Sequence, residues 1–333
     1  MKKGYPVIDF LRVIAAIFVI AIHIYPFASI SPFLDFICTR VVGRIAVPFF
    51  FMVISFFLFQ YGYPTYKHIK KTILSLLKWY GYAIMIYIPL MLYNHYFTQP
   101  HLYLEVIKDL FIDGTFYHLW YFPAVIVGLI IVLLLKKGLV LLAWGIVVIL
   151  YIVGLMGDSY YGMIVHIPAL QTFYDYLFVY MDYTRNGLFF APMFLMLGSV
   201  ISEEYSIHQK TFIFTGCISF VCMFIESLLL HTMTSIRHDA MYVFLPVVCF
   251  CLFYLCIQYQ GNRHPLCQKL SLYVYIFHPL MIVVVRMIGK FTHLMVFVDN
   301  NFIQFLLVVC GSFGVAYMIV YLLERKNGYG RKV

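Results

Sequence analysis

The chain alternates between long apolar runs and short polar connections. Most of these runs have about twenty residues, the length that an α-helix needs to cross the hydrocarbon core of a bilayer. The pattern predicts membrane-spanning helices over residues 8–28, 36–60, 74–94, 119–135, 139–156, 187–202, 211–231, 240–258, 272–289 and 302–323. The sixth run is short, begins at Gly187 and contains Pro192, so we expect a helix that is tilted, broken or longer than this run. The fold class is therefore an all-α polytopic membrane bundle of about ten transmembrane helices.

The connections between these runs have their own patterns. A basic segment from Tyr66 to Lys78 has the spacing of an amphipathic helix at the membrane surface. The connection from Asn94 to His118 is predicted to be partly helical, with a turn at Gly114. The tyrosine-rich connection from Gly157 to Asn186 is long enough to act as a lid or binding loop.

Composition supports a membrane protein, since 64% of residues are apolar and only 11% are charged, against roughly 25% charged in soluble domains. If the N-terminus is cytoplasmic, four Lys and Arg residues fall in outer loops, namely Lys108, Arg185, Arg237 and Lys290. Fifteen then fall on the inner side: Lys2, Lys3, Lys67, Lys70, Lys71, Lys78, Lys136, Lys137, Lys210, Arg263, Lys269, Arg325, Lys326, Arg331 and Lys332. This bias predicts cytoplasmic termini. It also explains the net charge of +9 without nucleic acid.

The first apolar run, "DFLRVIAAIFVIAIHIYPF", carries three ionisable side chains. Such groups are costly within a membrane, usually face the bundle interior and are functional candidates. Arg12 and His23 are eleven residues apart, which places them within roughly 20° of the same helix face and about 16 Å apart along the axis. Asp9 and Arg12, three residues apart, can form an ion pair. We expect Arg12 and His23 to line one polar cavity, with His23 nearer the outer mouth.

Further candidates lie along the next runs. Arg44 lies inside the second run, four residues before a helix-disrupting Pro48, and could line a cavity. Alternatively, Arg44 extends to the membrane surface or pairs with Asp35 or Asp9. His118 lies at the outer boundary, at the predicted level of His23.

The later candidates are Arg185, Asn186, Glu226, His238, Asp239 and His278. Arg185 and Asn186 lie where the tyrosine-rich loop re-enters the membrane and could bind a polar ligand. Asp239 could instead be an acid at a helix N-terminus, and His278 could be a neutral core histidine. His118, Arg185 and His238 are predicted to converge near the outer end of the first helix.

The eight cysteines show no paired spacing typical of a metal site, and no metal site is predicted. All but Cys267 fall in or at the edge of predicted helices, so we expect free thiols packed as small apolar groups.

Several motifs resemble the acyltransferase family 3 of bacterial membrane proteins. They are the arginine and histidine of 12 and 23, "GRIAVPFFFMVIS" at 43–55, "HLWYFP" at 118–123 and "LSLYVYIFHP" at 270–279. The chain is similar, more specifically, to membrane domains of VanT-type serine racemases. This likeness rests on "LRVIAA" at 11–16, "YHLWYFPA" at 117–124, "GDSYYG" at 157–162, "TRNGLFF" at 184–190 and "RHDAMYVFLPVV" at 237–248.

The resemblance implies a multi-pass bacterial cell-membrane domain over residues 1–324, and the start of a cytoplasmic linker over 325–333. It implies binding and import of L-serine for a cytoplasmic pyridoxal-phosphate racemase outside this chain. The product would be D-serine for cell-wall precursors in vancomycin resistance. The implied partners are L-serine, membrane lipid and the racemase domain, with no cofactor in this chain.

The alternative that the family implies is an O-acyltransferase using acetyl-coenzyme A, with His23 as general base and Arg12 at the site. Two departures from the family pattern argue against this use. Phe56 follows Ser55 where a small residue is usual, and the entry to the third helix is lysine-rich rather than arginine-rich. A membrane anchor with an inert polar interior is a third interpretation.

Overall fold

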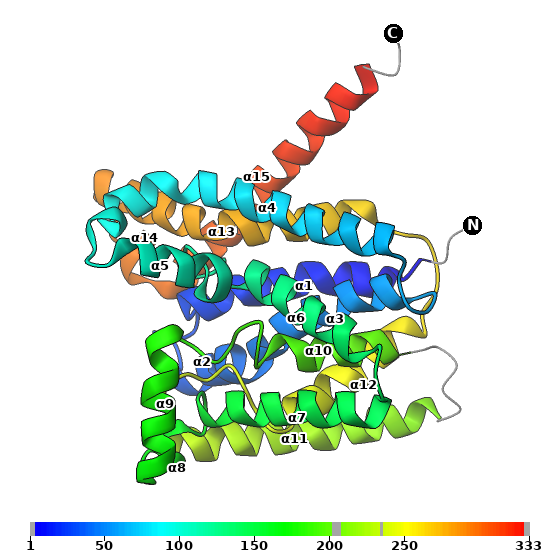
Figure 1. Cartoon of the computed structure of the whole chain (residues 1–333). Coiled ribbons are helices and arrows are strands. Elements are labelled where there is room, and N and C mark those ends of the chain that lie inside the picture. Colours follow the sequence, from blue (N-terminus) through cyan, green and yellow to red (C-terminus); the bar gives the residue numbers. More distant parts are fainter. Residues whose placement is uncertain (1–3, 202–207, 234–235, 330–333) are drawn as a thin grey trace. The chain divides into compact units, whose positions relative to one another are not determined.

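The computed structural model describes residues 4–201, 208–233 and 236–329, which are helical almost throughout (Figure 1). Each predicted span matches helical structure. The elements are α1 (Pro6–Ile24); α2 (Pro32–Phe36), η1 (Ile37–Val41), η2 (Val42–Ile45) and α3 (Ala46–Phe59); α4 (Tyr66–Tyr93); α6 (Tyr121–Leu135); α7 (Val140–Met156); α10 (Ala191–Val200); α11 (Gln209–Met233); α12 (Leu245–Ile257); α13 (Pro265–Phe291); and α15 (Asn301–Tyr329). The connections contain η3 (Tyr96–Thr98), α5 (Leu102–Lys108), η4 (Asp109–Asp113), α8 (Tyr161–Ile164), α9 (Pro168–Tyr180) and α14 (Val296–Asp299).

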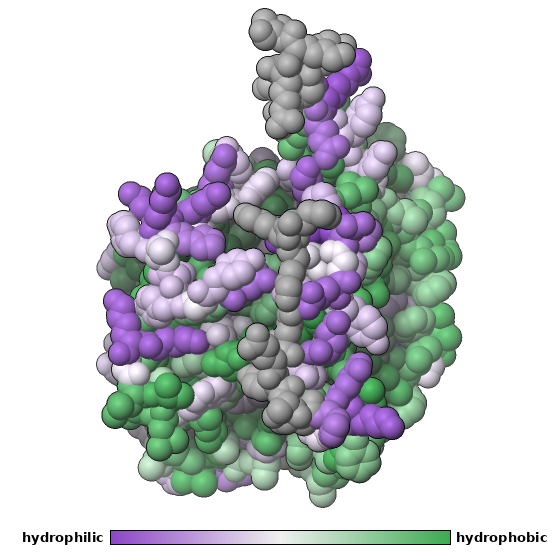
Figure 2. Space-filling model, turned by 90° about the vertical axis from the view of Figure 1, so that its right-hand side faces the viewer, coloured by the Kyte–Doolittle hydropathy of each residue, from purple (hydrophilic) through white to green (hydrophobic). Residues whose placement is uncertain are grey.

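Within the described residues, six helical segments are long and apolar enough to cross a membrane, and four apolar helices of 10–17 residues accompany them. Wide apolar surfaces remain exposed beside hydrophilic ones, as Figure 2 shows for one face. A polytopic membrane bundle accounts for this surface, because lipid covers apolar side chains as readily as protein does. The cytoplasmic placement of the termini stays a prediction, and Lys2, Lys3, Arg331 and Lys332 lie outside the described residues.

Two predicted boundaries differ from the structure. The basic segment after Tyr66 is the first part of α4 rather than a separate surface helix. Helix α13 begins at Pro265, so Cys267 is helical after all. Hydropathy marks only the apolar part of a helix, whereas the backbone ladder continues into polar residues at its end. None of the eight cysteines forms a disulfide, as predicted, but Cys217 and Cys310 are exposed rather than packed inside the protein.

The chain forms two compact units, one of residues Met1–Val47 with Leu255–Val333, and one of Pro48–Tyr254. In the first unit, α1 and α13 pack side by side and run in the same direction. Asp9 near the start of α1 contacts Gln268 near the start of α13. His23 at the end of α1 contacts His278, ten residues further along α13 than Gln268.

Helix α15 completes this unit and runs in the opposite direction. The Asn301 amide at its start donates to the backbone oxygen of Ile24 at the end of α1, at 3.1 Å. Glu324, far along α15, pairs with Lys269 near the start of α13 at 2.8 Å. These contacts fix how α1, α13 and α15 are aligned along their axes. In this alignment His23 and His278 lie side by side.

In the second unit, the short helix α10 is almost entirely buried. Small residues let its neighbours approach closely, as is common between membrane helices. A Cβ on Gly198 would lie 2.5 Å from the backbone oxygen of Met52 on α3. A Cβ on Gly128 of α6 would lie 2.9 Å from the Cβ of Ala191 on α10. The sixth helix is short, as predicted, since the ten residues of α10 rise only about 15 Å. It is continuous, has Pro192 in its first turn and lies inside the predicted run, so it is neither broken nor longer, and its tilt stays a prediction.

The second span is interrupted, as its proline suggested. A π-turn and a 3₁₀ turn precede α3. Pro48 has no backbone N–H to donate to the carbonyl of Arg44, which is four residues earlier. This missing donor lies where the 3₁₀ turn gives way to the α-helix of α3.

The two long connections, 94–118 and 157–186, are partly helical. The first contains α5 and η4, as predicted, and turns at Gly114. Gly114 has a φ of +85°, and a Cβ there would lie 2.2 Å from the backbone nitrogen of Trp120. Only glycine fits this turn. The second connection contains α8 and α9.

Candidate functional site

Asp9 anchors the start of α1 to the start of α13. Its carboxylate is 1% exposed and accepts hydrogen bonds from the Gln268 amide at 2.8 Å and the His264 backbone N–H at 2.9 Å. Arg12 lies 3.6 Å from the same carboxylate, which confirms the predicted pair. His264 is the N-cap position of α13, where a negative charge is stabilising. Asp9 therefore has a structural role at this helix start, with Arg12 as its counter-charge.

His23 and His278 face each other at the other end of α1. Their rings are stacked, with centroids 5.4 Å apart and planes 24° apart. His278 is fully buried, and its Nδ1 lies 2.9 Å from the backbone oxygen of Tyr275. The prediction of a satisfied core histidine is therefore right for Nδ1, but the ring also forms one side of a histidine pair.

Polar groups surround this end of the first unit. The guanidinium of Arg40 lies 5.0 Å from the ring centroid of Tyr25, which directly follows α1. Further along α13, Arg286 donates to the side-chain oxygen of Gln304 on α15 at 3.3 Å. Two arginines and two histidines thus lie near the predicted outer end of the unit.

Arg44 lies half-buried in the 3₁₀ turn before α3. Asp35, one of its predicted alternative partners, accepts hydrogen bonds from the Phe27 backbone N–H at 2.9 Å and the Thr39 hydroxyl at 3.4 Å. Asp9, the other, is engaged at α13 as described above. The role of Arg44 stays a prediction.

In the second unit, two buried carboxylates hold the irregular segment 236–244 that leads into α12. Asp158 accepts the backbone N–H groups of Ala240 at 2.8 Å and Met241 at 3.0 Å. Glu226 of α11 accepts those of Val243 and Phe244. Buried non-helical backbone needs such partners, because burial removes the water that would otherwise satisfy its N–H groups.

Two residues of the same segment, His238 and Asp239, also form histidine–carboxylate pairs with residues outside it. His238 Nδ1 lies 3.4 Å from Asp158, and Asp239 lies 3.4 Å from His231 Nε2. The other nitrogen of His231 contacts the backbone oxygen of Ser227 at 2.8 Å. Asp239 therefore has a side-chain partner as well as its position before α12, and the pairs connect the segment to α11 and to the end of α7.

Arg185 and His238 both pack against Tyr183. The Arg185 guanidinium lies 4.5 Å from the ring centroid of Tyr183 and 5.0 Å from that of Trp120. The His238 ring lies 5.1 Å from Tyr183. His118 is buried two residues before Trp120 and packs against other aromatic rings. Arg185 and His238 thus meet at Tyr183, whereas the ring of His118 packs against those of Tyr87, Phe116 and Tyr117. The convergence of the three residues on the first helix stays a prediction.

Asn186 is used by the chain itself. Its side-chain oxygen accepts the backbone N–H groups of Leu188 and Phe189, and its amide donates to the backbone oxygen of Tyr183 at 2.9 Å. The residue therefore fixes the turn that leads into α10. Asparagine side chains commonly satisfy the backbone N–H groups of a turn two or three residues further on in this way.

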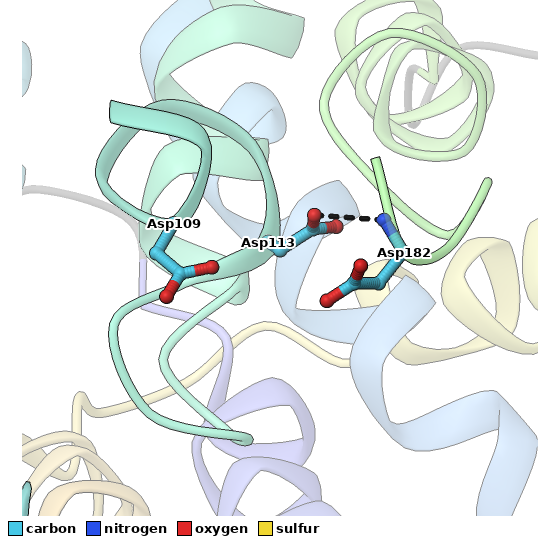
Figure 3. A group of neighbouring side chains, drawn as sticks. All are labelled: Asp109, Asp113 and Asp182. Atoms are coloured by element: carbon cyan, nitrogen blue, oxygen red, sulfur yellow. Dashed lines mark hydrogen bonds between the residues drawn. The ribbon is translucent and has the colours of Figure 1, made fainter. Parts of the chain in front are cut away.

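An acidic cluster joins the two long connections, 94–118 and 157–186 (Figure 3). Carboxylate oxygens of Asp109, Asp113 and Asp182 lie within 4.8 Å of one another. Asp113 accepts the backbone N–H of Asp182 at 2.8 Å, and Lys108 Nζ lies 3.0 Å from the Asp182 carboxylate. The Tyr96 hydroxyl donates to Asp109 at 2.6 Å.

Burial raises the pKa of Asp113 to about 7, and also raises that of Asp109. Burial opposes the charge of Lys108, but hydrogen bonds to Glu105 and Asp182 leave its pKa raised. The lysine, the tyrosine hydroxyl and the backbone N–H satisfy these carboxylates, so the cluster has a structural role in joining the loops.

Sequence reasoning missed Asp158, Gln268 and Asn301. Asp158 follows a glycine at the end of α7 in the motif "GDSYYG", and that position after an apolar run was the available signal. Gln268 and Asn301 become informative only once α13 and α15 are placed against α1.

Comparison with protein families and with curated proteins finds matches over nearly the whole chain. The family described as "Acyltransferase domain" matches residues 5–321. Two proteins of Enterococcus faecalis named amino-acid racemase are 39% and 40% identical, and match 100% and 97% of this chain. A serine/alanine racemase of Enterococcus gallinarum is 35% identical over 98% of it.

The chain spans about half the length of these curated relatives, with 48%, 46% and 47% of each covered. No solved structure matches it. A multi-pass helical architecture, the ionisable pattern of α1 and a family match over nearly the whole length lead to one conclusion. The chain belongs to the acyltransferase family 3 of bacterial membrane proteins, and is homologous to the N-terminal membrane part of serine/alanine racemases.

Proposed function

We propose that this chain is a membrane domain that binds L-serine and imports it for a racemase domain on the cytoplasmic side. The observation that carries the proposal is the extent of the match. The whole chain aligns with 48% of an amino-acid racemase, and 98% of it aligns with 47% of a serine/alanine racemase. A membrane domain that is joined to an enzyme acting on an amino acid is well placed to supply that amino acid as substrate.

The chemistry of the first unit is compatible with such a ligand. A free amino acid presents a carboxylate, which suits a guanidinium, and an ammonium and a hydroxyl, which suit imidazole nitrogens. The histidine pair of α1 and α13 lies in the same unit as Arg12, Arg40 and Arg286. The carboxylates of Asp9 and Glu226 already accept several hydrogen bonds from the chain itself. We therefore assign serine recognition to the histidines and an arginine rather than to these acids.

The downstream steps of the proposal lie outside this chain. Pyridoxal phosphate would belong to the racemase domain, and D-serine would enter cell-wall precursors of a vancomycin-resistance pathway. Arg44, His118, Arg185, His238 and Asp239 remain proposed contributors along the route of the ligand.

Liposome uptake tests the import proposal. The purified chain is reconstituted, and radiolabelled L-serine entry is compared with that into empty liposomes and into liposomes holding His23→Ala. Protein-dependent, saturable entry that the substitution reduces supports the proposal. Binding of L-serine without entry would limit the function to binding. The absence of both binding and entry would refute the proposal.

A second candidate function is O-acyl transfer, which the family match over residues 5–321 favours. His23 would accept the proton of an acceptor hydroxyl, and acetyl-coenzyme A would be the donor. In that case His23→Ala lowers the rate of acyl transfer by about 10²-fold or more, while the affinity for the ligand stays nearly unchanged. If His23 only binds serine, the same change weakens binding by roughly 1–3 kcal/mol. Measuring acetyl-coenzyme A hydrolysis alongside serine binding separates the two functions.

A further inference from the structure

The His278–Pro279 dipeptide has a consequence for hydrogen bonding inside α13. In an α-helix each backbone N–H donates to the carbonyl four residues earlier. Pro279 has no N–H, so the carbonyl of Tyr275 lacks its usual helical donor. The Nδ1 atom of His278 lies 2.9 Å from that oxygen and 3.2 Å from the oxygen of Val274. The histidine side chain thus takes the place of the missing backbone donor.

This contact determines where the imidazole carries its proton. A carbonyl oxygen is only an acceptor, so the ring nitrogen beside it must be the N–H donor. In the neutral ring the lone pair is then on Nε2. His278 is fully buried, which disfavours the charged form. The geometry therefore holds one neutral tautomer, with the proton on Nδ1.

The fixed ring of His278 lies against His23. The two rings are stacked with their centroids 5.4 Å apart, so the His278 ring covers one face of the His23 ring. The hydrogen bond of His278 prevents its ring from rotating freely. His23 is itself only part-buried and lies in the last turn of α1, one residue before its end at Ile24. Asn301 fixes that end by donating to the backbone oxygens of Ile24 and Tyr25. Two independent contacts thus restrict the position of the His23 imidazole.

We propose that His278 is a positioning residue for His23, and that Pro279 makes it one by leaving the Tyr275 carbonyl to accept the Nδ1 proton. The inference rests on the proposed function in one respect: His23 is the residue expected to hydrogen-bond the ligand hydroxyl. The His278 tautomer itself depends only on the geometry of α13. The same arrangement serves serine binding and acyl transfer, since both require an imidazole aimed at a hydroxyl.

The first experiment observes the tautomer directly. The chain is labelled with ¹⁵N-histidine, and the His278 signals are identified by their absence in His278→Phe. The expected spectrum has a protonated Nδ1 and an unprotonated Nε2 at neutral pH. Pro279→Ala, which restores a competing backbone N–H, should produce a mixture of tautomers. A protonated Nε2 on His278, or an unchanged spectrum in Pro279→Ala, would overturn the proposal.

The second experiment measures the consequence for ligand choice. L-alanine differs from L-serine by lacking the hydroxyl, so the ratio of their affinities reports on the group that His23 is expected to bind. We expect His278→Phe and Pro279→Ala each to reduce the preference for serine by about tenfold, with a smaller effect on alanine. Equal loss for both ligands would contradict positioning.

Pro89→Ala is the matched control, because Pro89 also lies inside a long helix, α4. It should change neither the histidine spectrum nor the serine preference, and an equal effect there would refute a specific role for Pro279. If His278→Phe does not fold, Pro279→Ala carries both tests. If the wild-type chain binds neither amino acid, the proposed function fails, while the tautomer result still decides the inference about α13.

Discussion

Replacing Asp158 tests how the irregular segment before α12 is stabilised. The carboxylate is 1% exposed and accepts two backbone N–H groups, those of Ala240 and Met241. Asp158→Ala leaves both without this acceptor, and each buried unsatisfied donor costs about 1–3 kcal/mol. The expected loss is therefore roughly 2–6 kcal/mol, twice the cost of one donor. At about 2 °C per kcal/mol, the low end for chains of 150–250 residues, the midpoint should fall by about 4–12 °C.

Asp158→Asn separates the hydrogen bonds from the charge. Its side-chain oxygen can still accept both N–H groups, but the carboxylate that lies 3.4 Å from His238 Nδ1 loses its charge. We expect a smaller loss, about 1–2 kcal/mol, because hydrogen bonds to a charged group are stronger than those to a neutral one. Asp175→Ala, an exposed carboxylate on α9, should change stability by less than about 0.5 kcal/mol.

The chain supplies its own reporters for this measurement. Cys249, Cys251 and Cys256 are free and buried on α12, directly after the segment that Asp158 holds. A thiol-reactive fluorophore in detergent solution therefore reports unfolding of this region during heating. The reasoning is refuted if Asp158→Ala has the same melting temperature as Asp175→Ala. It is also refuted if Asp158→Asn lowers the melting temperature as much as Asp158→Ala does.

Three further predictions concern the long connections and the helix contacts. Burial raises the pKa of Asp113 to about 7, so its folded form binds a proton more tightly than the unfolded form. The backbone amides of the two connections that the acidic cluster joins should accordingly become less protected from hydrogen exchange as pH rises from about 4 through 7. The loss of protection should be smaller in Asp113→Asn, and a gain of protection with rising pH would contradict this prediction. Gly114→Ala should lower the melting temperature more than Gly62→Ala, because both have positive φ but only Gly114 meets backbone within 4 Å. Gly198→Ala should destabilise the chain at its contact with α3, whereas Gly145→Ala, with open space around it, should be nearly neutral or stabilising; equal melting shifts would refute either comparison.

The sequence predicts the helices well because lipid imposes a simple rule. A membrane-spanning segment needs a long apolar run, and hydropathy detects such runs directly. Each of the ten predicted spans therefore coincides with helical structure. The starts of α4 and α13 were placed too late, since both helices continue into polar residues that hydropathy does not count.

The polar contacts were harder to predict because they depend on packing between distant segments. The Asp9–Arg12 pair follows from helical spacing alone and was predicted. The His23–His278 pair requires α1 and α13 to lie side by side in the same direction, which no local pattern specifies. Glu226 and Asn186 are ambiguous in sequence, since a buried polar residue can bind a ligand or complete the backbone hydrogen bonding of its own chain. Their contacts show the second role, and the site assignment of the remaining candidates stays a prediction.

Thermal protection of the purified chain is the most direct test of serine binding. A ligand that binds only the folded state raises its stability by mass action. The proposal predicts that L-serine raises the melting temperature in a saturable way, that His23→Ala reduces this effect, and that acetyl-coenzyme A has no effect. Protection by acetyl-coenzyme A without protection by L-serine would contradict the proposal and favour acyl transfer.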